Sequence, residues 1–184
     1  MNEPETLYLD HNATTPPDPA VLETMDRVAR VAWANPSSVH RPGQAARHRL
    51  EEARGQVAAL LGARPRSVIF TSGGTESNDL ALGGMLEGPA ARDRRRVLVT
   101  STAEHPAVRE PAAWLAEQGV EWIELPVDRV GRVDAAALDS VLGAHATAES
   151  TVRVSVIWAH HETGGISPVP ELAAVVERHR SRLR

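Results

Sequence analysis

The chain reads Phe70-Thr71-Ser72-Gly73-Gly74-Thr75-Glu76-Ser77-Asn78 at the point where a strand-like run passes through a glycine-rich turn into a helical pattern. Such a turn presents the free N–H groups of the first helical turn, and the positive end of the helix dipole, to an anion. Two interpretations stay open. The turn is either a phosphate cradle, with Thr75 adding a hydroxyl, or a tight strand-to-helix connection with Thr75 as the N-cap.

Strand and helix patterns alternate on the C-terminal side of this turn. Strands are predicted at 67–71, 96–100, 120–125 and 152–158, and helices at 75–85, 107–118, 134–142 and 169–182. The Ala- and Gly-rich stretch 143–149 is predicted to be a surface loop. This alternation predicts an α/β fold, with a mostly parallel sheet and helices on both of its faces.

The N-terminal third shows a different pattern. A short strand is predicted at 7–9, and two helices follow at 19–33 and 44–61. Asp18 before Pro19 is typical of a helix start, and Gly62 is typical of a helix end. At its other end the chain stops after a helix with no returning strand, so we expect a truncated or split α/β domain.

Composition narrows the class of protein. The 184 residues are 42% hydrophobic and 24% charged, which is typical of a soluble globular domain. The formal charge of −4 argues against a nucleic-acid binder. The dense basic run, at Arg92, Arg94, Arg95 and Arg96, is interpreted as a solvated loop before a strand. The N-terminus lacks the apolar core of a signal peptide and no stretch is long enough to span a membrane, so a cytoplasmic protein without membrane contacts is predicted.

Two residue types are missing from the sequence. All 20 Lys+Arg positions are arginine, and there is no cysteine. Disulfides, a thiolate nucleophile and a cysteine-based metal site are therefore excluded within these residues.

Histidines follow two of the predicted strands. His105 lies in the segment Thr102 to Pro106, at the carboxyl end of a strand, where open α/β sheets bind ligands. Its imidazole is either structural or placed to stack on a ring or shuttle protons. His160-His161-Glu162 suggests a metal site. Adjacent residues on an extended strand point to opposite sides, however, so no metal is predicted.

Five segments occur in a set order along the chain: Tyr8-Leu9-Asp10-His11-Asn12-Ala13-Thr14-Thr15-Pro16, Asn35-Pro36-Ser37-Ser38-Val39-His40, the turn 71–78, Glu104-His105 and His161-Glu162-Thr163-Gly164. In this order they resemble cysteine desulfurases, which belong to the class V aminotransferase group of fold-type I pyridoxal 5'-phosphate (PLP) enzymes. The resemblance covers nearly the whole chain. It implies an N-terminal arm at 1–15, and at 16–184 the N-terminal part of the PLP-binding large domain, without its C-terminal part or the small domain.

The resemblance also implies site residues. Gly74 and Thr75 would hold the PLP phosphate, and His105 would stack on the cofactor ring as the catalytic residue. His161 falls where the family has the second Asn of an Asn-Asn-Glu segment, which contacts the pyridoxal hydroxyl. The family's remaining Asp, Gln, cofactor-binding Lys and catalytic Cys lie beyond the matching stretch.

The function implied is a cysteine desulfurase-like protein that takes sulfur from L-cysteine for Fe–S cluster or thio-cofactor supply. The expected partners are a C-terminal half or a full-length desulfurase protomer, a sulfur-acceptor protein, and a second copy in a homodimer. Two alternatives stay open. One is a non-catalytic accessory or remnant chain that binds a desulfurase protomer or a phosphorylated ligand. The other is another class V reaction, such as selenocysteine lysis or transamination, completed in trans.

Overall fold

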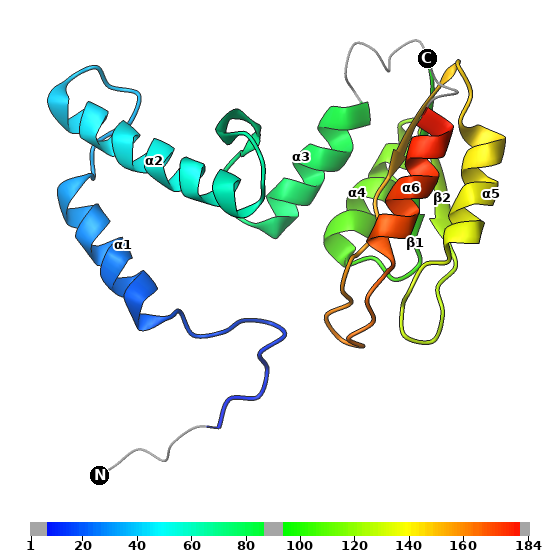
Figure 1. The fold of residues 1–184 in the computed structure, drawn as a ribbon, viewed down its shortest axis with the longest axis horizontal. Helices are drawn as coiled ribbons and strands as arrows, with labels where there is room; N and C mark the ends of the chain where they lie inside the picture. The colour runs from blue at the N-terminus through cyan, green and yellow to red at the C-terminus, as the bar shows by residue number, and fades with distance from the viewer. Residues whose placement is uncertain (1–6, 87–93, 181–184) are drawn as a thin grey trace. The chain divides into compact units, whose positions relative to one another are not determined.

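The computed structural model describes residues 7–86 and 94–180 (Figure 1). The chain forms two compact units, Met1–Phe70 and Thr71–Arg184. Parts of three sequence-based predictions lie outside the described residues: the first six residues of the N-terminal arm, Arg92 of the basic run, and the end of the last helix at Arg182.

The first unit contains the helices α1 (Pro19–Val31) and α2 (Arg41–Leu60) and the short 3-10 helix η1 (Pro65–Ser67). α1 begins as predicted, because the Asp18 carboxylate accepts a hydrogen bond from the N–H of Ala20. Gly62 follows α2 with a φ of +61°, the left-handed conformation that ends many helices, as predicted.

α2 begins three residues earlier than predicted. The N-cap is His40, whose Nδ1 accepts a hydrogen bond from the N–H of Gly43 at 3.2 Å. Pro42 lies in the first turn, where its missing N–H carries no cost. An imidazole is not among the common capping side chains, so the sequence pattern did not reveal this start.

Gly43 fits closely against the loop that precedes α2. A Cβ on Gly43 would lie 2.5 Å from the Ser38 carbonyl oxygen and 2.8 Å from that of Asn35. We expect Gly43→Ala to lower the free energy of unfolding by about 1–3 kcal/mol through overpacking. Gly55→Ala in the same helix is the control, because no described atom lies within 4 Å of its added Cβ. Equal stability of the two variants in urea unfolding would contradict the close fit.

The strands predicted at 67–71 and 7–9 are wrong. Residues 65–67 form η1, and no strand is assigned at 68–71 or 7–9. The apolar side chains there are exposed, to 69% at Ile69 and 80% at Leu7. A strand exists only when its N–H and C=O groups pair with a neighbour, and no described residue pairs with either segment.

The second unit is built on a three-stranded parallel sheet. β1 (Arg95–Ser101) lies between β2 (Glu121–Leu125) and β3 (Ser150–Val154). Val97 is in register with Glu121 on one side and with Val152 on the other. The predicted parallel sheet is confirmed.

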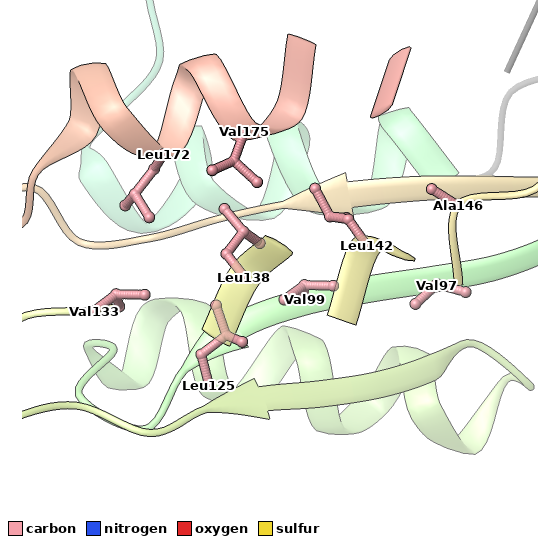
Figure 2. Packing of buried hydrophobic residues seen from close by; sticks show 9 residues of the cluster. All are labelled: Val97, Val99, Leu125, Val133, Leu138, Leu142, Ala146, Leu172 and Val175. Atoms are coloured by element: carbon pink, nitrogen blue, oxygen red, sulfur yellow. The ribbon is translucent and has the colours of Figure 1, made fainter. Parts of the chain in front are cut away.

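Helices cover both faces of this sheet. They are α3 (Gly74–Leu86), α4 (Pro106–Glu117), α5 (Ala135–His145) and α6 (Val169–Arg180). Figure 2 shows Leu138 and Leu142 of α5 and Leu172 and Val175 of α6 against Val97 and Val99 of β1. Leu98, on the other face, packs with Leu82 of α3 and with Val108, Ala112 and Leu115 of α4. Alternate residues of one buried strand thus serve two cores, and the two-sided covering is confirmed.

β3 ends at Val154 rather than at Trp158. Beyond it, the Ser155 N–H still donates to the Val99 carbonyl at 2.9 Å. Two residues further along, the N–H of Ile157 donates instead to the carboxylate of Glu104 at 2.8 Å. A side chain therefore takes the place of the neighbouring strand.

Two further segments differ from expectation. α5 continues through His145, so the loop predicted at 143–149 begins three residues late. Arg95 and Arg96 belong to β1 rather than to a solvated loop. Arg95 pairs with Glu121 at 2.6 Å, and Arg96 donates to the Gln118 carbonyl at 2.8 Å.

Candidate functional site

Two of the four predicted site residues meet at the carboxyl end of the sheet. His105 follows β1, and His161 follows the segment that contains β3. Because β1 and β3 are parallel neighbours, both histidines lie at the carboxyl end of the sheet. Their ring centroids lie 5.6 Å apart, and the ring planes are inclined by 60°. The other two, Gly74 and Thr75, open α3, which packs against α4, the helix that His105 caps.

The glycine-rich turn is closed by its own side chains. The Glu76 carboxylate accepts hydrogen bonds from the N–H and the hydroxyl of Ser72, both at 2.6 Å. The Thr71 and Ser77 hydroxyls lie 2.6 Å apart. The Ser72 hydroxyl and N–H lower the pKa of Glu76, so this carboxylate is ionised near neutral pH and holds the turn in shape.

The start of α3 contradicts the prediction that Thr75 is an N-cap. The helix begins at Gly74, so Thr75 lies inside the first turn and is not the N-cap. The N–H groups of Gly74, Thr75 and Glu76 then have no acceptor within the helix. Neither the capping interpretation nor the helix itself accounts for the Thr75 hydroxyl.

Gly73 and Gly74 occupy open space. A Cβ on either would have no atom of the described residues within 4 Å. Neither glycine has a positive φ. Backbone conformation and packing among the described residues would therefore accept a larger side chain at both positions.

His105 is fixed by its helix. Its Nδ1 accepts a hydrogen bond from the N–H of Ala107 at 3.0 Å, and Pro106 occupies the first helical position. In the neutral ring this leaves the proton on Nε2. The imidazole is exposed, so its orientation is set while its surface stays free.

Glu104 supports the site in a way the sequence analysis missed. This buried carboxylate accepts from the Ser101 hydroxyl at 2.6 Å and from the Ile157 N–H at 2.8 Å. It thereby ties the turn that carries His105 to the segment that leads to His161. The available signal was an acidic residue three positions after the end of an apolar strand, a place where solvation would be lost.

Removing this carboxylate should loosen the second unit. We expect Glu104→Ala to cost about 1–3 kcal/mol, because it leaves a buried donor unpaired. Glu104→Gln keeps an oxygen acceptor and should cost less than Glu104→Ala. Urea unfolding measures both. Equal loss in the two variants would show that Glu104 acts by its volume or charge rather than as an acceptor.

The two adjacent histidines do not point to opposite sides, so that prediction is wrong. The rings of His160 and His161 are stacked, with centroids 5.2 Å apart and planes inclined by 10°. The reason is local: the Gly164 N–H donates to the His160 carbonyl at 2.9 Å, so the chain turns here instead of staying extended. Among residues 7–86 and 94–180, no group of three or more His, Asp or Glu side chains has a metal-binding arrangement.

The described helices include none that is both long and apolar enough to cross a membrane. The prediction of a cytoplasmic location remains a prediction.

Comparison with known proteins places the chain in a family. The family model for aminotransferase class V matches residues 7–183. An IscS-like cysteine desulfurase from Mycobacterium tuberculosis is 45% identical over 170 residues, which are 91% of this chain and 42% of that protein. A selenocysteine lyase from Bos taurus is 37% identical, covering 93% of this chain and 42% of that protein.

A solved structure agrees with these relatives. A NifS-like protein superimposes with a TM-score of 0.85 and 33% sequence identity, covering 94% of this chain and 45% of that chain. The chain thus spans less than half the length of the relatives it matches.

Proposed function

Since the chain belongs to the class V aminotransferase family and is cysteine desulfurase-like, we propose that its second unit forms part of a PLP site for sulfur abstraction from L-cysteine. The observation that carries this proposal is the open space beside Gly73 and Gly74, where an added Cβ would touch no described atom. A phosphate can approach such a backbone closely and take the free N–H groups of the helix start.

The four residues have separate roles in this proposal. Gly74 would donate its N–H and Thr75 its hydroxyl to the phosphate. The exposed face of His105 would stack on the cofactor ring. His161, whose ring centroid lies 5.6 Å from that of His105, would donate a ring N–H to the cofactor hydroxyl, as the family's Asn amide would.

The chain's residues bind and orient the cofactor but do not complete the reaction. PLP, when bound, draws electron density from the substrate carbon that carries the amino group. Covalent attachment needs an amine, and sulfur transfer needs a thiolate. With no lysine and no cysteine among these residues, we infer that both groups come from outside them.

A titration with PLP tests the cofactor site. The chain should bind PLP weakly and reversibly, which is measured by the change in cofactor absorbance. Borohydride treatment should then fix no pyridoxyl group to an internal residue, because only the α-amino group is available. Phosphate should compete. An adduct mapped by mass spectrometry to an internal side chain, or the absence of binding, would contradict the proposal.

Selenocysteine lysis is a second candidate, favoured by the 37% identity to the bovine lyase. Both substrates carry their chalcogen, sulfur or selenium, on the β-carbon, and both reactions break that bond. By our proposal the four site residues contact only the cofactor, so they do not distinguish the two substrates. The substrate preference of a completed active site, measured with cysteine and selenocysteine side by side, distinguishes them.

A further inference from the structure

His160 lies beneath the exposed His161 in the turn that follows β3. It is half-buried, whereas His161 is exposed. Its Nδ1 lies 3.3 Å from the N–H groups of both Glu162 and Thr163, which donate to it. The ring is thus held by the backbone of its own turn, and one face of His161 is stacked on it.

The loop that follows β2 packs against His160. Residues 127–133 form a tight hairpin closed by the Val127–Val133 bridge. The Asp128 carboxylate accepts from the N–H groups of Val130 at 2.9 Å and Arg132 at 3.0 Å, and from the Arg132 guanidinium at 2.8 Å. These contacts, the Arg132 N–H foremost, lower the pKa of Asp128, so the hairpin is held by an ionised carboxylate.

This hairpin packs closely on the histidine turn. The Thr163 hydroxyl donates to the Val130 carbonyl at 2.6 Å. A Cβ on Gly165 would overlap the same carbonyl oxygen. A Cβ on Gly131 would lie 3.3 Å from Cδ2 of His160, and Gly131 has a φ of +86°. Glycines at these positions let the two loops meet, and the His160 ring lies at their contact.

We propose that His160 is a positioning residue that, seated against the 127–133 hairpin, holds the His161 imidazole beside His105. The part of this inference that concerns cofactor affinity rests on the proposed function. His160 itself needs no contact with the cofactor. An exposed imidazole samples several rotamers, and stacking on a fixed ring removes that freedom before a ligand binds.

Two substitutions separate the ring of His160 from its hydrogen-bonding role. His160→Asn keeps a side-chain acceptor for the turn but removes the ring. His160→Phe keeps the ring but removes the acceptor. Positioning by stacking predicts that the Asn variant weakens PLP binding by about three- to tenfold, the range of an aromatic pair, and that the Phe variant stays within about twofold.

The decisive measurement does not require the cofactor. NMR of the PLP-free 184-residue chain gives the ring-proton shifts of His161, assigned by their disappearance in His161→Gln. In His160→Asn these protons should lose the ring-current shift of the stack, whereas in His160→Phe a ring-current shift should persist. Unchanged His161 shifts in the Asn variant overturn the proposal.

The two proposals fail in different ways. If the wild-type chain binds no PLP but the His161 shifts move in His160→Asn, the cofactor site fails and the positioning of His161 stands. If PLP binds equally well to wild type and His160→Asn while the shifts move, the stack exists but does not serve the site, and the positioning role in binding is overturned.

Discussion

Co-expressed with a second polypeptide that carries the C-terminal portion of a cysteine desulfurase, the chain should release sulfide from cysteine in the presence of PLP and a reductant. Each polypeptide by itself should give only background. The reason is composition: the residues that bind PLP by our proposal lie in this chain, whereas the sequence holds no lysine and no cysteine. The expected complex restores both groups to one site.

The sheet offers a place for such a partner. Among the described strands, β3 pairs only with β1, so no described strand covers its other edge. A groove of about 500 Å³ runs beside it, lined mainly by Val152, Val154, Val156, Leu172 and Val176. All but Val156 belong to β3 or α6, and an added parallel strand would bury those that are still partly exposed.

Co-elution in size-exclusion chromatography and a sulfide assay measure the complex. Without a partner, we expect the chain to self-associate or to be poorly soluble. A monodisperse, cooperatively folded monomer, together with neither complex nor sulfide release from any C-terminal half tested, would contradict the prediction. The accessory-chain alternative would then be the better account.

The second large effect is expected at the phosphate cradle. Gly74→Val should weaken PLP binding by at least about tenfold, because a branched side chain blocks hydrogen bonds to a charged phosphate that are each worth about 1.5–3 kcal/mol. The folded chain has room for the valine, since no described atom lies within 4 Å of the added Cβ. A loss of PLP binding will therefore show that the valine occupies space that the ligand needs.

Gly84→Val is the matched control. Gly84 lies in the same helix, is exposed, and has the same open surroundings. Neither valine should lower helix stability appreciably, because valine has a slightly higher helix propensity than glycine, and only the valine at position 74 should affect PLP binding. Equal PLP affinity in Gly74→Val and wild type would show that the turn is merely a connection between elements.

Local patterns predicted the elements whose partners lie within the chain. β1, β2 and β3 were found because each buries apolar side chains beneath helices that the same sequence encodes. The segments at 7–9 and 67–71 have the same apolar character but were wrongly predicted as strands. The difference lies in pairing: an apolar run becomes a strand only where a neighbour completes its hydrogen bonds, and periodicity does not reveal the neighbour.

The candidate site, like the fold, was predicted only in part. Each histidine follows a strand of a parallel sheet, and this was enough to place His105 and His161 at the same carboxyl end of the sheet. The stack of His160 on His161 was missed because an extended conformation was assumed where the chain turns at Gly164. The anchoring of Ile157 by Glu104 joins residues 53 positions apart, which no local pattern encodes.

The empty space at Gly74 also bears on how far this position tolerates change. Glycine in the middle of a helix costs roughly 0.5–1 kcal/mol relative to alanine. Gly74 is the first residue of α3, and no described atom would meet an added Cβ there, so the described fold alone would accept alanine. By our proposal it is the ligand, and not the fold, that makes this position sensitive to a side chain.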